Sequence, residues 1–209
     1  MEDTYVICIA RQYGSGGHVI GKILSRMLGL DYYDKELITQ AAKKSGICPE
    51  YFEHADEKAP GSLSHALSTG LFSGGGIFMY NNSLSNESIF KYQSEVIRSV
   101  SQAGSCIIVG RCADYILREK KNCFSIFITA PLEDRARRIA EREGVGVDKA
   151  AEKAKKVDKV RREYYNYYTS KHWGHASSYD LSIDSSTLGD EQTACFIRDF
   201  VLRALEDMR

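Results

Sequence analysis

The chain has 209 residues, no formal net charge, and 43% hydrophobic and 27% charged residues. This length and composition are typical of a single soluble α/β domain with a sizeable core. A balanced charge gives no general attraction to nucleic acid or to an anionic membrane, so we expect neither as a partner. The N-terminus lacks the basic head and apolar core of a signal peptide, and no apolar run is long enough to span a membrane.

The six cysteines are scattered along the chain and form no C-x-x-C pair. Cys8, Cys106 and Cys123 lie in or beside apolar runs, as buried thiols do. This pattern predicts a reduced, cytoplasmic protein that has no structural zinc site and holds no metal through its own side chains.

An apolar run at residues 6–10 leads into a glycine-rich loop at residues 11–18, and a helical pattern follows and ends at Gly29. The apolar face of this predicted helix comprises Ile20, Ile23, Leu24, Met27 and Leu28. A strand, a glycine loop and a helix together present backbone N–H groups and a helix N-terminus to a phosphate. The alternative is an ordinary turn between strand and helix. Three glycines within four residues favour anion binding.

The loop differs from a Walker A motif, G-x-x-x-x-G-K-[ST]. Gly17 stands at the lysine position, His18 at the hydroxyl position and Arg11 at the first glycine. The loop also does not match the dinucleotide-binding fingerprint G-x-G-x-x-G, because Val19 stands at the position of the third glycine. The loop therefore indicates a phosphate site without identifying the phosphate.

A short strand is expected at residues 30–33, followed by Asp34 and a helix at residues 35–44. Asp34 either caps that helix or contacts a ligand, and its place also resembles the ribose-binding acid of a dinucleotide fold. Residues 46–88 are irregular and interrupted by proline and glycine. Such a segment is typical of a functional lid or a flexible insertion.

After a helix that begins at Ile89, the continuous apolar run at residues 106–109 predicts a strand buried on both faces. It delivers Gly110 and Arg111 to its carboxyl end, where ligands bind in open α/β sheets. An arginine there offers a planar fork for phosphate or carboxylate, whereas the alternative is a structural surface arginine.

Another apolar run, at residues 124–129, precedes two charged helices predicted at residues 132–143 and 148–168. Their basic residues indicate either a lid that closes over polyphosphate or a solvated helical hairpin, and both readings stay open. Five aromatic residues are expected to dock this hairpin on the body: Tyr164, Tyr165, Tyr167, Tyr168 and Trp173. A final strand at residues 179–183 and a terminal amphipathic helix complete an alternation that implies a parallel sheet covered on both faces.

Several segments together resemble the cytidylate kinase-like family, a branch of the P-loop nucleoside monophosphate kinases. They are I-A-R-Q-Y-G-S-G-G at residues 9–17, D-Y-Y-D-K-E-L at 31–37, V-G-R-C-A-D-Y-I-L at 109–117, D-K-V-R-R-E-Y-Y at 158–165 and Y-D-L-S-I-D-S at 179–185. The resemblance implies a three-layer P-loop kinase fold with a five-stranded parallel sheet. Residues 1–209 would form a single domain, with an acceptor-side insertion at 46–88 and a helical lid at 132–168.

The resemblance also implies phosphoryl transfer from ATP, with Mg²⁺, to a nucleoside monophosphate (cytidylate-like) or another small acceptor. Asp34 and Arg111 would face the acceptor. The donor would be held by Arg11, Gly14, Ser15, Gly16, Gly17 and His18, and the catalytic charges would come from Arg111, Arg135, Arg138, Asp158 and Arg162. The positive charge absent at Gly17 would be supplied by Arg11, His18 or a lid arginine.

Two other functions remain as hypotheses. A nucleotide- or anion-binding protein with a degenerate P-loop would bind phosphate with little transferase activity. A dinucleotide-dependent oxidoreductase is disfavoured by Val19 and by the arginine-rich hairpin. The sequence leaves the acceptor and the oligomeric state open.

Overall fold

The computed structural model describes residues 4–34 and 86–208. The helix predicted at residues 35–44 and all but the last few residues of the predicted insertion at 46–88 lie outside the described residues. In the described part of the chain, no helix is both long enough and apolar enough to cross a membrane.

The five described strands form one parallel sheet, in the order β2-β3-β1-β4-β5. They are β1 (Val6–Arg11), β2 (Asp31–Tyr33), β3 (Cys106–Val109), β4 (Cys123–Thr129) and β5 (Leu181–Asp184). In the central β1, Ile7 pairs with Ile107 of β3 and with Phe124 of β4. The continuous apolar run of β3 is buried throughout, because helices cover both faces of a parallel sheet. The predicted fold class is confirmed.

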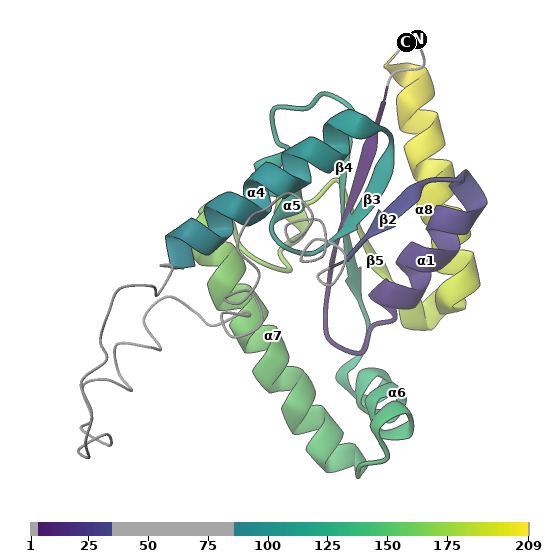
Figure 1. Cartoon of the computed structure of the whole chain (residues 1–209). Coiled ribbons are helices and arrows are strands. Elements are labelled where there is room, and N and C mark those ends of the chain that lie inside the picture. Colours follow the sequence, from purple (N-terminus) through teal and green to yellow (C-terminus); the bar gives the residue numbers. More distant parts are fainter. Residues whose placement is uncertain (1–3, 35–85, 209) are drawn as a thin grey trace, which may run out of the picture.

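Helices cover both faces of this sheet, with α1 and α8 on one side and α4 and α5 on the other (Figure 1). They span α1 (Gly17–Leu28), α4 (Asn86–Ala103), α5 (Ala113–Ile116) and α8 (Ser185–Asp207). Alternate residues of β1 serve the two sides: Ile7 and Ile9 pack in the cluster with α1 and α8, whereas Val6 and Cys8 face α4 and α5. This alternation is the period of two that a β-strand imposes.

The remaining helices, α6 (Leu132–Glu143) and α7 (Val147–Thr169), form a hairpin that projects beyond the sheet (Figure 1). Ala136 and Ile139 of α6 pack against Ala150 and Ala154 of α7, and small residues allow this close approach. Gly144 ends α6 in the left-handed conformation with φ 66°. The two helices predicted here are confirmed, and the closing of this hairpin as a lid stays a prediction.

The structure differs from the sequence-based expectation in several details, including the start of α4 at Asn86 and of β5 at Leu181. The four-residue helix α5 and the short 3₁₀ helix η1 (Ala176–Ser178) were not predicted. Met27 is 38% exposed and lies outside the buried face of α1. Tyr167 is 54% exposed, whereas the other four docking aromatics pack between α7 and the body.

Candidate active site

The glycine loop joins the carboxyl end of β1 to the N-terminus of α1. Gly14 and Gly16 have φ of 83° and 81°, in the left-handed region that favours glycine. A Cβ on Gly14 would lie 2.8 Å from Ile139 Cδ1, and one on Gly16 would lie 2.6 Å from Asp190 Oδ1. Both glycines are therefore required by torsion and by space. The N-cap of α1 is Gly16, which has no side chain to cap the helix, and N–H groups at such a helix start suit an anion.

Ser15 holds this loop from inside the protein. It is fully buried, and its Oγ donates towards the carbonyl oxygens of Gln12 at 2.9 Å and Ile128 at 3.1 Å. The predicted donor-site residue Ser15 is thus placed as a support of the loop backbone, with its hydroxyl directed away from the surface.

An ion pair between the two hairpin helices holds the glycine loop through hydrogen bonds to the Tyr13 backbone. Arg135 of α6 and Asp158 of α7 are buried, with Nη1 and Oδ2 2.7 Å apart. Asp158 Oδ1 accepts from the Tyr13 N–H at 2.7 Å, and Arg135 Nη1 donates to the Tyr13 carbonyl at 3.1 Å. Burial raises the pKa of Asp158, an effect that the Tyr13 N–H and the Arg135 charge oppose. Two predicted catalytic residues are therefore engaged with the backbone of the loop.

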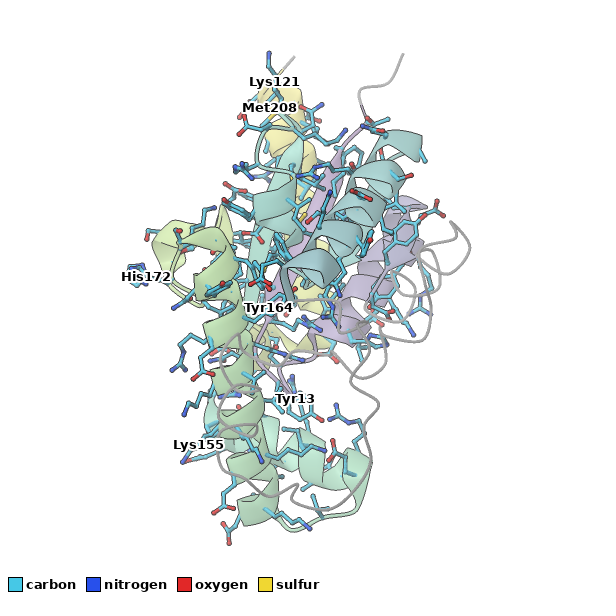
Figure 2. The ribbon with its side chains drawn as sticks, turned by 60° about the vertical axis from the view of Figure 1, so that its left-hand side comes forward. Tyr13, Lys121, Lys155, Tyr164, His172 and Met208 are labelled. Carbon is cyan, nitrogen blue, oxygen red and sulfur yellow. The ribbon has the colours of Figure 1, made fainter. Side chains whose placement is uncertain are left out.

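The side chain of Tyr13 extends this contact along the hairpin, and Figure 2 shows it near α6 and α7. Its hydroxyl donates to Glu143 Oε1 at 2.7 Å and accepts from Arg142 Nη2 at 2.9 Å. Its ring lies within 6 Å of three cationic heads, those of Arg142, Lys153 and Arg161. The loop and the hairpin are consequently one connected unit.

The two other predicted lid arginines lie in different surroundings. Arg138 Nη1 donates to Ser185 Oγ at 3.3 Å and lies 3.7 Å from Asp190 Oδ1, beside Gly16. Arg162 lies on the exposed side of α7. The preceding residue, Arg161, reaches the loop instead, and its Nη1 donates to the Arg11 carbonyl at 3.1 Å.

A second loop, after β3, lies against the Arg11 side chain at the end of β1, and both line one pocket. Gly110, Arg111 and Cys112 follow one another with φ of 85°, 60° and 54°. Left-handed torsions in two consecutive non-glycine residues are costly and occur mainly at functional sites. The turn places Arg111, which is 8% exposed, in the pocket wall.

The pocket is basic and aromatic. Its polar and aromatic lining comprises Arg11, Arg111, Asp114, Arg161, Tyr164, Tyr165 and Trp173. Tyr164 projects from α7 towards α4, where its hydroxyl donates to Gln93 Oε1 at 3.1 Å (Figure 2). Tyr165 Oη donates to Asp114 Oδ2 at 2.6 Å, and burial raises the pKa of Asp114. Three arginines beside one engaged carboxyl group suit an anionic ligand.

His18 and Asp34 form a small polar group at the start of α1. Tyr32 Oη lies within hydrogen-bond distance of His18 Nδ1, at 2.9 Å, and that nitrogen is 3.5 Å from Asp34 Oδ2. The helix predicted at residues 35–44 lies outside the described residues, so the two alternatives for Asp34, a helix cap and a ligand contact, both stay predictions.

Among the described residues, no group of three or more His, Cys, Asp or Glu side chains is arranged to hold a metal ion.

Sequence reasoning missed Arg161 and Asp190 as site residues. Arg161 and Arg162 lie three and four residues after Asp158, so the spacing places both near its helix face and does not single out Arg161. Asp190 carried no signal, since its approach to Gly16 depends on where α8 begins in space.

Comparison with known proteins assigns the chain to a family. The family model described as "Cytidylate kinase-like family" matches residues 6–187. The chain belongs to the cytidylate kinase-like family. Among its relatives, the cytidylate kinase of Pyrococcus horikoshii is 26% identical over 94% of this chain and 88% of its own length. The cytidylate kinase of Pyrobaculum calidifontis is 23% identical over 96% and 94%, respectively.

Solved structures of similar fold include an uncharacterized protein from Eubacterium ventriosum, with a TM-score of 0.70 and 27% identity, covering 94% of this chain and 98% of that chain. Shikimate kinase from Acinetobacter baumannii matches with a TM-score of 0.51 and 15% identity, over 97% of this chain and 96% of that one. This cytidylate kinase-like chain therefore has a P-loop kinase fold, and its family supports a nucleoside monophosphate kinase-like function.

Proposed function

We propose that the protein transfers a phosphoryl group from ATP, with Mg²⁺, to a nucleoside monophosphate, and that CMP is the natural acceptor to test first. The observation that carries the proposal is the strained turn after β3, which places Arg111 in a basic pocket beside Arg11, the residue that ends β1 and begins the glycine loop. The glycine loop then leads into the N-terminus of α1.

Each loop suits one phosphate partner. The N–H groups at the start of α1 would bind donor phosphates, and Arg138 beside Gly16 would add positive charge. The fork of Arg111 would hold the acceptor phosphate with two parallel hydrogen bonds. Phosphoryl transfer depends mainly on such positioning and charge neutralisation, to which bound Mg²⁺ would add by neutralising charge on the donor phosphates.

An ATP-coupled acceptor screen tests this function. CMP, UMP, AMP, GMP and shikimate would each be offered with ATP and Mg²⁺, and nucleoside diphosphate or phosphorylated product would be measured. We expect turnover with CMP, and a rise of tenfold or more in the KM for the acceptor in Arg111→Ala. Arg118 is an exposed arginine a few residues later, so Arg118→Ala is the matched control. It should change neither the turnover rate nor the KM for the acceptor.

One observation favours a second function. Gly17 leaves the usual lysine position of the loop without a charge of its own. If ATP binds and no acceptor is phosphorylated, the protein is a nucleotide- or anion-binding protein with a degenerate P-loop. If NAD(P) stabilises the protein against heat and ATP does not, both the kinase and the degenerate P-loop interpretation fail.

A further inference from the structure

The side chain of Arg11 lies against two glycines that belong to different loops. A Cβ on Gly17 would lie 2.7 Å from Arg11 Cβ and 2.9 Å from Arg11 Cγ. A Cβ on Gly110 would collide with Arg11 Nη1. The aliphatic stem of Arg11 therefore runs beside the first residue of α1, and its guanidinium reaches the turn that carries Arg111. Any other residue at position 17 or 110 would displace this side chain.

The other candidate cations near the loop lie in different places. His18 Nδ1 is within hydrogen-bond distance of Tyr32 Oη. The Arg135 guanidinium is bonded to Asp158 and to backbone carbonyls, and Arg138 contacts Ser185 and Asp190. Of the cations weighed for this role, Arg11 is the one whose side chain runs from the start of α1, where its stem lies, to the Gly110 turn, where its guanidinium lies.

The backbone of Arg11 is also fixed. Arg11 is the last residue of β1, it pairs in register with Ile128 of β4, and its carbonyl oxygen accepts from Arg161 Nη1 at 3.1 Å. A long side chain on a rigid backbone, with its stem packed against glycine, loses little freedom when its head binds a ligand.

We propose that Arg11 takes over the task of the missing P-loop lysine: its guanidinium binds the terminal phosphate of the donor and holds it towards the acceptor at Arg111. Gly17 and Gly110 are the glycines that make room for it. A guanidinium is always protonated and binds two phosphate oxygens at once, so it satisfies the charge requirement of this position. The inference rests on the proposed function of the same site.

The exchange between Arg11 and Gly17 can be tested in both directions. Gly17 does not have a positive φ, so its backbone accepts a lysine once the whole Arg11 side chain, Cβ included, is removed. Four variants are compared with the wild type: Arg11→Met, Gly17→Lys, Arg11→Gly with Gly17→Lys, and Arg26→Ala as an exposed arginine control on α1. Calorimetry measures the Kd for ATP and for inorganic tripolyphosphate, and thermal melting monitors folding.

We expect Arg11→Met to weaken binding of both ligands by about tenfold to a hundredfold, the usual effect of one charged hydrogen bond. Gly17→Lys should also bind more weakly, because its Cβ meets the Arg11 stem. The double variant should recover to within about threefold of the wild type, a non-additive result expected only for residues in contact. Arg26→Ala should bind as the wild type does.

The remaining outcomes decide against one proposal or the other. Wild-type affinity in Arg11→Met, or a double variant that binds no better than Arg11→Met, overturns the role of Arg11. If the wild type binds tripolyphosphate but no nucleotide, and Arg11→Met loses that binding, the kinase proposal fails and the role of Arg11 in phosphate binding stands. If the wild type binds neither ligand, both proposals are wrong.

Discussion

Arg135 Nη1 lies 2.7 Å from Asp158 Oδ2, and this buried pair ties the two helices of the hairpin to the Tyr13 backbone. A phosphate-binding loop needs a fixed backbone, because its backbone N–H groups are the hydrogen-bond donors that bind the phosphate. The pair therefore positions the loop through Tyr13, in addition to any contact its side chains make with a ligand.

Removing one partner of this pair should be costly. We expect Arg135→Met to lower the free energy of unfolding by about 3–5 kcal/mol, because it leaves the Asp158 carboxylate buried without its cation. Replacing both residues, Arg135→Met with Asp158→Leu, should cost less than the sum of the single changes. Urea unfolding measures both, and Arg137→Ala, which breaks an exposed pair with Asp134, should stay within about 0.5 kcal/mol of the wild type. A loss in Arg135→Met no larger than in Arg137→Ala would contradict the assignment.

Gly110→Ala should damage both stability and donor binding. A left-handed alanine costs about 1–2 kcal/mol by itself, and its Cβ would also displace the Arg11 guanidinium. Gly29→Ala provides the matched control, since Gly29 has φ of 63° and a Cβ there would meet nothing within 4 Å. We expect thermal melts to show a similar loss of stability in both variants, because both place alanine in a left-handed conformation. ATP binding should be weaker than in the wild type only in Gly110→Ala. Equal ATP affinity in the two variants would show that the close approach of Gly110 to Arg11 does not contribute to ATP binding.

Glu143 should make the hairpin sensitive to acid. Contacts with Lys153, Arg142 and Tyr13 lower the pKa of Glu143 from 4.5 to about 2. Because the folded state prefers the charged form, this stabilisation is complete above about pH 4.5 and is lost as the pH falls towards 2. Glu143→Gln should therefore melt below the wild type at pH 7, by a difference that shrinks between pH 4.5 and 2. The exposed Glu141→Gln is the control, and a pH-independent difference for Glu143→Gln would refute the explanation.

Tyr165→Phe should shift the titration of Asp114. Burial raises the pKa of Asp114, and the hydrogen bond from Tyr165 lowers it in part, so the variant should titrate at higher pH than the wild type. Since the folded state then favours the protonated form, stability should decline more steeply in the variant as the pH rises above about 4. Carboxyl ¹³C NMR measures the pKa, with the exposed Tyr167→Phe as control. An unchanged or lower pKa in Tyr165→Phe would disprove the role of this hydrogen bond.

The sequence predicts the fold well where packing leaves a pattern. The apolar run at residues 106–109 predicts a buried strand, because both faces of a parallel strand are covered by helices. Gly29 predicts the end of α1, because a helix end in the left-handed conformation favours glycine. Arg111 follows from the same logic, since ligands gather at the carboxyl ends of parallel strands. The four-residue α5 is too short to show a helical period.

The details of the site depend on contacts between distant segments. The glycines at positions 17 and 110 are visible in the sequence, but their common neighbour, Arg11, appears only when β1 and β3 are paired. Arg161 and Arg162 are adjacent in a basic run, and only the packing of α7 shows which one faces the loop. Helical periodicity alone does not separate neighbours on the edge of a buried face.

The three left-handed residues at positions 110–112 have a consequence for the acceptor. Two of them are not glycine, and each such torsion costs about 1–3 kcal/mol. The free energy of folding includes this cost, because the surrounding core fixes the turn before any ligand binds. An incoming phosphate would therefore meet an arginine whose backbone needs no rearrangement. In the proposed function, the same rigidity would keep the Arg111 backbone from moving towards an acceptor of different length. The position of the turn would then select acceptors that bring their phosphate within reach of the arginine side chain.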